Sequence, residues 1–273
     1  MATASERYDI HSPKRYLEYT ETPQYRAFRD LSNPGSAASN FAVLKSMENA
    51  EKSLEAIEAY YVGPTYINVM PKFEFTADSV SPAESWRFFL RNGYEIGRRS
   101  IWRMTFCEKA SPMLLVRRCQ VQSGTGKLPQ SIAALLVEYC GGQEYGLRLI
   151  ERQMTKGGAT AYVAFTPEGV PVSICVGQGY GAAYCITALF TTEKMRRQGY
   201  GAAALLAAMR GAAEAKLGYS TIFMDTLAEN TEAVQLFEKA GFRGQVHTVY
   251  SAFKGGVPAQ WSRMSPAELE GGA

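Results

Sequence analysis

The sequence predicts an α/β fold, of the α+β kind in which helices cover a mixed sheet. β-rich runs alternate with segments of helical periodicity along most of the 273 residues. Glycines stand where three of the expected helices would end, at Gly93, Gly218 and Gly241. The hydrophobic fraction of 46% is typical of a packed globular protein. This length is enough for one large domain or two ordinary ones.

Composition and charge exclude several classes of protein. The net charge of +3 permits an anionic ligand but does not indicate a nucleic-acid or membrane partner. No apolar run approaches the roughly 20 residues that a membrane span needs, and the N-terminus lacks a secretory pattern. The cysteines, which include no C-x-x-C pair, are Cys107, Cys119, Cys140, Cys175 and Cys185. Reduced thiols in a cytoplasmic protein without a metal site explain this set best.

The first part of the chain is expected to hold few regular elements. Residues 1–35 are polar and contain several prolines, which predicts irregular structure with one short helix. Helices are expected over 41–60 and 82–92, and strands over 66–70 and 94–107. The first of these helices is predicted from an apolar stripe formed by Phe41, Leu44, Met47, Leu54 and Ile57.

A junction is expected at 110–112, where Ala, Ser and Pro follow one another. A strand over 113–120, a loop over 123–127 and two helices over 128–140 and 144–155 are then expected.

Three strands follow, over 159–165, 170–176 and 183–190. The glycine-rich segment 177–181 is interpreted as a flexible turn between the last two. A helix begins after Gly199, and the last expected strand before the final helix covers 220–227.

The final helix is predicted to begin at Asn230, whose side chain can cap it, and to end at Gly241. Residues 255–273 contain glycines, prolines and scattered charges, so this tail is expected to be loose.

The segment after the strand over 183–190 is typical of a phosphate site. Arg196 and Arg197 precede Gly199 and Gly201, and these residues open an alanine-rich helix. The first-turn N–H groups of a helix have no partner inside the helix, and the helix dipole favours an anion beside them. Glycines let a phosphate approach the backbone, and arginines add charged hydrogen bonds.

Two motifs in this order carry a resemblance to a known family. The first is Arg-x-x-Gly-x-Gly/Ala, and the second is Asn-x-x-Ala-x-x-Leu-Tyr/Phe-x-x-x-Gly-Phe. The matching residues are Arg196, Gly199, Gly201, Asn230, Ala233, Leu236, Phe237, Gly241 and Phe242. The chain therefore resembles the GNAT superfamily of acyl-CoA-dependent N-acyltransferases over about residues 112–254. The order of the elements expected there is also that of the GNAT fold.

The N-terminal half resembles a degraded copy of the same fold. Residues 88–94 are similar to residues 236–242, and both end in glycine and an aromatic residue. The resemblance implies a tandem GNAT protein with a degenerate, shortened N-terminal domain at 1–110, a GNAT domain at 111–255 and a flexible tail at 256–273. An unrelated α/β cap is the alternative.

The resemblance implies acetyl-CoA, or another short acyl-CoA, as co-substrate. It would lie where the strands over 183–190 and 220–227 separate, with an N–H near Leu189 or Phe190 polarising the thioester carbonyl. The residues expected to bind it are Leu189, Phe190, Thr191, Arg196, Arg197, Gln198, Gly199, Tyr200, Gly201, Ala202, Asn230, Ala233 and Phe237.

The chain departs from the family at the catalytic acid. Many members have a tyrosine where this chain has Phe237, which has no proton to donate. Asp225, Glu229, Tyr184 and Cys185 are the alternative catalytic candidates. Ordinary strand packing would equally explain Tyr184 and Cys185, and a solvated strand end or a helix cap would explain the two carboxylates.

The expected function is therefore transfer of an acetyl or short acyl group from acetyl-CoA to a primary amine, preferably of a small molecule, by direct attack on the thioester. One alternative is a non-catalytic CoA sensor or structural protein. A nucleic-acid module built on the basic segment 98–103 is another, and an outward charged strand face explains that segment more simply. The sequence has no signature of the acceptor, the acyl chain length or an oligomeric state.

Overall fold

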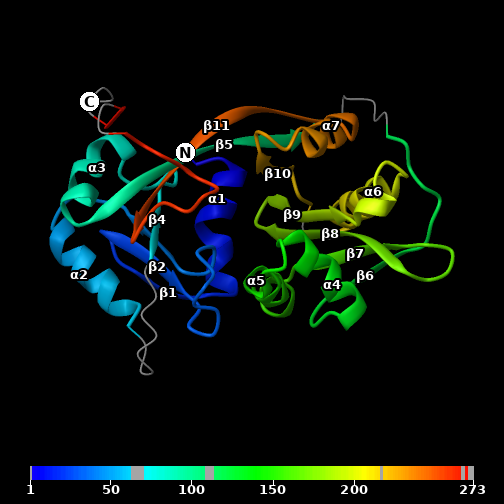
Figure 1. The fold of residues 1–273 in the computed structure, drawn as a ribbon, viewed down its shortest axis with the longest axis horizontal. Helices are drawn as coiled ribbons and strands as arrows, with labels where there is room; N and C mark the ends of the chain where they lie inside the picture. The colour runs from blue at the N-terminus through cyan, green and yellow to red at the C-terminus, as the bar shows by residue number, and fades with distance from the viewer. Residues whose placement is uncertain (1, 63–70, 108–113, 216–217, 266–267, 270–273) are drawn as a thin grey trace. The chain divides into compact units, whose positions relative to one another are not determined.

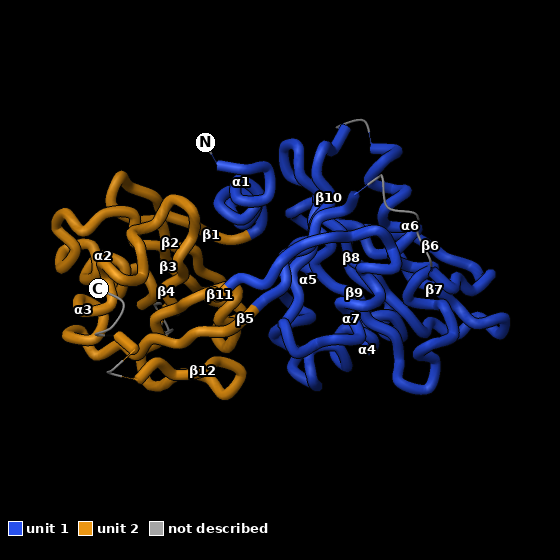
Figure 2. The backbone as a smooth tube through the Cα atoms, turned by 90° about the horizontal axis from the view of Figure 1, so that it is seen from above, with its two compact units in different colours: residues 1–16, 101–247 blue, residues 17–100, 248–273 orange. Residues whose placement is uncertain are grey.

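The computed structural model describes residues 2–62, 71–107, 114–215, 218–265 and 268–269 (Figure 1). The chain forms two compact units, which Figure 2 colours separately. Unit 1 contains Met1–Tyr16 and Ile101–His247, and unit 2 contains Leu17–Ser100 and Thr248–Ala273. Two long strands, β5 (Tyr94–Phe106) and β11 (Phe242–Lys254), contribute residues to both units.

The sheet of unit 1 has the strand order β5-β10-β9-β8-β7-β6. Its remaining strands are β6 (Val121–Gly124), β7 (Thr160–Phe165), β8 (Pro171–Tyr180), β9 (Ala183–Thr191) and β10 (Thr221–Leu227). The pair β9 and β10 is parallel, whereas the other neighbours are antiparallel. The sheet is therefore mixed, as the sequence predicted.

Helices cover both faces of this sheet (Figure 1). They are α1 (Ala4–His11), α4 (Gln130–Tyr139), α5 (Glu144–Thr155), α6 (Tyr200–Glu214) and α7 (Thr231–Lys239). The helices α6 and α7 pack in one core cluster with side chains from one face of the sheet. The helices α4 and α5 pack in a second cluster with side chains of the sheet that do not belong to the first. On the α4 side, Tyr8 of α1 donates a hydrogen bond from its Oη to Gln178 Oε1 of β8 at 2.7 Å. Arg15, which follows α1, donates to the carbonyl of Gly179 on the same strand.

Strand β9 changes the face that its side chains cover at a bulge. Val176 of β8 is opposite Ala188, but the next residue, Gly177, is opposite Ile186, so Thr187 is an extra residue in β9. Ile186 consequently packs with α6 and α7, whereas Ala188 packs with α4 and α5. In a regular strand these two side chains would lie on the same face.

Unit 2 has its own core and contains the other strands. Its strands are β1 (Glu18–Glu21), β2 (Tyr25–Arg29), β3 (Phe41–Leu44), β4 (Lys72–Glu74) and β12 (Ser262–Arg263). The first four pair in chain order, β4 pairs with β11, and β12 pairs with β5. The helices α2 (Ala50–Tyr60) and α3 (Pro82–Arg91) bury their apolar faces in one cluster with Phe73 and Tyr94.

Several sequence-based expectations need correction. A hairpin, β1 and β2, occupies part of the segment expected to be irregular. The helix expected over 41–60 is a strand over 41–44 and a helix from Ala50. The strand expected over 113–120 lies instead at 121–124. The strand expected over 66–70 and the junction at 110–112 lie outside the described residues.

The two glycine-rich segments are also more ordered than expected. The segment 177–181 was interpreted as a turn, but β8 continues to Tyr180 and pairs with β9 along this stretch. The tail contains β12 and two buried side chains, Met264 and Leu269. The compact units also divide the chain differently from the contiguous domains expected at 1–110 and 111–255.

The described part of the chain has no helix long and apolar enough to cross a membrane. No group of three or more potential metal ligands comes together among the described residues. The five cysteines are free thiols.

A glycine inside α6 gives a first test of the packing. A Cβ at Gly211 would lie 2.0 Å from Oη of Tyr162. Alanine normally stabilises a helix interior by about 1 kcal/mol relative to glycine. We expect Gly211→Ala to gain much less than this in the wild-type chain and to gain more in a Tyr162→Phe background, where the nearest ring carbon would lie 2.8 Å from the new Cβ. Urea unfolding of the four proteins measures both gains, and equal gains would show that the hydroxyl does not limit this position.

Candidate functional site

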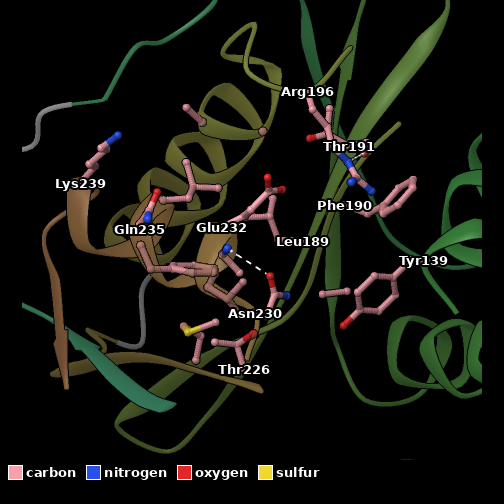
Figure 3. Close-up of a pocket in the computed structure, with 18 of the residues that line it drawn as sticks. Tyr139, Leu189, Phe190, Thr191, Arg196, Thr226, Asn230, Glu232, Gln235 and Lys239 are labelled. Atoms are coloured by element: carbon pink, nitrogen blue, oxygen red, sulfur yellow. Dashed lines mark hydrogen bonds between the residues drawn. The ribbon is translucent and has the colours of Figure 1, made fainter. Parts of the chain in front are cut away.

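A cleft opens where β9 and β10 stop pairing. The last parallel pair is Ile186 with Met224, although β9 continues to Thr191 and β10 to Leu227. A cavity of about 670 Å³ is lined by these unpaired ends and by the starts of α6 and α7 (Figure 3). The separation leaves one edge of β9 without a partner strand, so its backbone groups face the cleft.

The hydrogen-bond pattern of β9 shows which residues present these groups. The N–H of Thr192 donates to the carbonyl of Val172 on β8. Because backbone groups alternate in direction along a strand, Leu189 and Thr191 direct their N–H and C=O to the opposite edge. Arg196 Nε donates to the carbonyl of Thr191 at 3.3 Å, which agrees with this direction. Leu189 is therefore the residue whose N–H faces the cleft, and Phe190 directs its backbone toward β8.

A glycine loop connects β9 to α6. Gly199 caps α6 in the left-handed conformation, with φ of +84°, and Arg197 also has a positive φ of 62°. A Cβ at Gly199 would lie 2.5 Å from the backbone nitrogen of Arg117 and 2.8 Å from the carbonyl oxygen of Leu115. The Arg117 N–H donates to the Gly199 carbonyl at 3.2 Å. The loop is therefore held against backbone, and its position depends on glycine.

The loop brings positive charge to the mouth of the cleft. Arg196 and Arg197 both line it, next to the start of α6. Arg197 Nη2 donates to Glu232 Oε1 at 2.6 Å, and Glu232 belongs to the first turn of α7. This hydrogen bond, together with the charge of Arg197, lowers the pKa of the Glu232 carboxyl below its ordinary value. An ion pair therefore joins the two walls of the cleft.

The wall formed by α7 has a polar start and an apolar body. The side chain of Asn230 accepts a hydrogen bond from the N–H of Ala233 at 3.2 Å and caps the helix. Phe237 is 2% exposed and packs edge-on against Phe242, with ring centroids 5.2 Å apart. This wall holds no ionisable side chain at the position of Phe237.

The structure brings most of the expected cofactor residues to this cleft. Those that line it are Leu189, Phe190, Thr191, Arg196, Arg197, Gly199, Gly201, Ala202, Asn230, Ala233 and Phe237. Tyr200 is instead buried in the core of unit 1. Gln198 donates from its side chain to the carbonyl of Lys194. These two residues can contribute through the backbone of the loop.

The expected catalytic residues do not all reach the cleft. Asp225 lines it, and both of its carboxylate oxygens accept hydrogen bonds from Arg103, at 2.9 and 2.6 Å. Arg103 also pairs with Asp9 of α1 at 2.8 Å. Asp225 is thus oriented by a cation that it shares with a second carboxylate.

Tyr184, Cys185 and Glu229 are not among the residues that line the cleft. Tyr184 is buried and packs against Tyr219, and burial raises the pKa of its hydroxyl. Cys185 is buried near Tyr8, and burial also raises the pKa of its thiol. Glu229 lies exposed in the turn before α7. Tyr184 and Cys185 therefore lie in the packed core rather than at the cleft.

Several residues that line the cleft were not expected from the sequence. They are Leu114, Leu115, Glu138, Tyr139, Thr226, Gln235 and Lys239. Gln235 and Lys239 are four residues apart on α7, so they share a face of that helix, but neither stands at helical spacing from Asn230 or Ala233. Glu138 and Tyr139 end α4, and no local pattern connects that helix to this site.

Comparison with protein families agrees with the motifs. Residues 135–242 match the Acetyltransferase (GNAT) family. The search among curated proteins found no match.

Solved structures resemble the chain over nearly its whole length. A GCN5-related N-acetyltransferase from Kribbella flavida has a TM-score of 0.62 at 15% identity, covering 96% of this chain and all of that one. A putative GNAT acetyltransferase from Novosphingobium aromaticivorans has a TM-score of 0.55 at 14% identity, covering 93% and 97%.

A tandem GNAT protein from the clavulanic acid biosynthesis pathway has a TM-score of 0.55 at 12% identity, covering 86% of this chain and 79% of that one. At these identities the likeness establishes the fold. The predicted GNAT fold is confirmed, and the N-terminal half is also GNAT-like.

Proposed function

Because residues 135–242 carry a GNAT acetyltransferase domain, we propose that this protein transfers an acetyl or other short acyl group from an acyl-CoA to a primary amine. The observation that carries the proposal is the cleft between β9 and β10, where an unpaired strand edge meets a glycine loop and two arginines. A diphosphate and a pantetheine arm together need this combination of charge and open backbone.

Each part of the cofactor has a matching part of the cleft. The first-turn N–H groups of α6, with Arg196 beside them, suit the diphosphate. Gly201 lets the start of α6 pack closely against β9, since a Cβ there would lie 2.9 Å from Thr191 Oγ1. The outward backbone groups of Leu189 and Thr191 suit the amide groups of the pantetheine arm.

The chain also offers groups for the acyl transfer itself. When bound, the thioester supplies the acyl group and a thiolate that departs readily. The Leu189 N–H faces the cleft and would stabilise negative charge on the carbonyl oxygen, a contribution of about 3 kcal/mol. The carboxylates of Glu138 and Asp225 line the cleft and favour a cationic amine as acceptor. The acceptor proposed is therefore a small-molecule primary amine.

A second candidate is a CoA-binding protein without turnover. It is favoured by Phe237, which occupies the position of the usual tyrosine and is buried against Phe242. In that case the cleft would hold the cofactor, and no amine would be acylated.

Calorimetry with CoA and with pantetheine tests the binding site. CoA is expected to bind with a Kd on the order of micromolar, and pantetheine, which lacks the diphosphate, much more weakly. Thiol release from acetyl-CoA in the presence of a panel of primary amines then tests catalysis. Equal affinity for the two ligands would remove the diphosphate assignment. CoA binding without thiol release above the uncatalysed rate would support the second candidate.

The ion pair between Arg197 and Glu232 leads to a further prediction. Glu232→Gln is expected to strengthen CoA binding by about twofold to fivefold, because the carboxylate competes with the diphosphate for Arg197. Since the pKa of Glu232 is lowered, this carboxyl is charged throughout the neutral range, and the gain should not vary between about pH 6 and 8.

Calorimetry at low and high salt measures this gain, which should shrink as salt screens the exposed charges. Glu144→Gln is the matched control, because Glu144 pairs with Arg148 on α5 and does not line the cleft. Weaker binding by Glu232→Gln would mean that the carboxylate supports the arginine rather than competing for it.

A further inference from the structure

The cleft contains few groups that could give a proton to a departing thiolate. The non-arginine ionisable side chains among the described residues that line it are Glu138, Tyr139, Asp225, Glu232 and Lys239. Glu232 is paired with Arg197 at the mouth, and both oxygens of Asp225 accept from Arg103. Lys239 ends α7 and lies far from Tyr139 in Figure 3.

Tyr139 has a different position. It is the last residue of α4, and its ring centroid lies 6.3 Å from that of Phe190 on β9. In Figure 3 its ring lies across the cleft from Gln235 and Lys239, and its hydroxyl points into the cleft. The side chain is 44% exposed, so a ligand in the cleft can reach it.

The bulge in β9 directs the side chains that follow it toward α4. Beyond Thr187, the side chains of Ala188 and Phe190 face the α4 side, while Leu189 directs its backbone into the cleft. Phe237 approaches from the opposite side of the sheet, within the core formed by α6 and α7. A hydroxyl on α4 and the Leu189 N–H therefore border the same stretch of the cleft, although no hydroxyl is present at residue 237.

The surroundings of Tyr139 keep its hydroxyl protonated. Although the side chain is partly exposed, desolvation within the cleft raises its pKa above the ordinary value, and the neighbouring thiols of Cys140 and Cys185 raise it further. At neutral pH the group is therefore a proton donor rather than a base.

We propose that Tyr139 is a catalytic residue of the acyl transfer, and that its hydroxyl donates the proton that the leaving thiolate takes up. This rests on the proposed function. The amine nitrogen bonds to the carbonyl carbon as the carbon–sulfur bond breaks, and the sulfur takes the Tyr139 proton. The proton released by the amine returns through solvent to the tyrosinate, so the net products are the amide and the free thiol.

The experiment compares Tyr139→Phe with Tyr145→Phe. Tyr145 lies on α5, has a similar exposure of 41%, and is not part of the cleft lining. The readouts are the Kd for CoA, and kcat and its pH dependence for thiol release from acetyl-CoA with primary amines. Tyr139→Phe is expected to lower kcat by about a hundredfold with an unchanged Kd, as for loss of a general acid.

The pH profile separates catalysis from structure. Because the pKa of Tyr139 is raised, wild-type kcat should fall only above about pH 10, where its hydroxyl ionises, and Tyr139→Phe should lack this fall. Tyr145→Phe should match the wild type in every readout. A wild-type kcat and profile in Tyr139→Phe would overturn the role of Tyr139 while leaving the proposed function intact. If the wild type releases no thiol with any amine, the proposed function fails first and this role fails with it.

Discussion

Replacing Gly199 with alanine is expected to weaken CoA binding by about a hundredfold or more. The residue has φ of +84°, where an L side chain is strained by about 1 kcal/mol or more. The new Cβ would also meet the backbone of Arg117 and Leu115 at 2.5 and 2.8 Å. Backbone atoms cannot swing aside as a side-chain end can, so the loop that presents the α6 amides must move. Calorimetry with CoA measures the loss.

Gly169→Ala is the matched control for this substitution. Gly169 has φ of +80° in the turn between β7 and β8, and a Cβ there would meet nothing within 4 Å. It therefore carries the same backbone strain without the clash. Both variants should lose similar stability from strain, and only Gly199→Ala should lose CoA binding. If the two variants bound CoA equally well, the glycine loop would not be the diphosphate site.

Replacing Arg103 with methionine is expected to destabilise the protein by about 2 kcal/mol at neutral pH. Burial by itself lowers the pKa of Arg103, but hydrogen bonds and the charges of Asp225 and Asp9 outweigh burial, so its pKa is raised. Without the guanidinium, two carboxylates would face each other. Breaking a fully buried pair costs about 3–5 kcal/mol, and the partial exposure of these side chains, 25–34%, reduces that cost.

The loss should depend on pH in a defined direction. In Arg103→Met the two carboxylates repel each other in the folded state, and protonation removes this repulsion. The deficit is then smallest in acid, near pH 4, and grows as pH rises toward 7. Urea unfolding across this range measures it. Adding Asp9→Asn and Asp225→Asn should restore most of the stability, and no restoration would assign the loss to packing instead.

The spacing of apolar residues correctly predicted helices and strands whose pattern is complete within one segment. The helix expected over 144–155 matches α5, and the strand expected over 94–107 matches β5 within one residue. The error at residues 41–60 has a specific cause. Phe41, Leu44 and Met47 continue the helical spacing of α2, but Asn49 adopts a left-handed conformation with φ of 54° at the start of that helix. The strand over 41–44 has four buried residues in a row, so its apolar residues do not alternate with polar ones. Its sequence therefore could not be distinguished from the start of a helical stripe.

The glycines of β8 show a different limit. Gly177 and Gly179 were interpreted as a turn, yet they lie in a paired strand. A Cβ at either residue would fall within 2.1 Å of the hydroxyl of Tyr184 or Tyr219. These glycines make room for aromatic rings, and a single sequence does not distinguish that role from chain reversal.

The sequence predicted only those residues of the candidate site that belong to a single motif. The glycine loop and Asn230 are contiguous with their helices, so spacing located them. Arg103 is 122 residues from Asp225, and their pairing depends on the register of β5 with β10. Tyr139 lines the cleft from the end of α4, where it packs against Phe190 of β9. Both depend on tertiary packing, which has no local signature.

The tie between α1 and β8 has a consequence for how this chain is made. Tyr8 and Arg15 find their partners, Gln178 and Gly179, 170 and 164 residues further along. At a translation rate of about 5–20 residues per second, those partners leave the ribosome roughly ten to thirty seconds after the first helix. During that interval α1 is without these partners and is accessible to proteins that bind nascent chains. The residues of α1 are thus synthesised well before their native neighbours on β8.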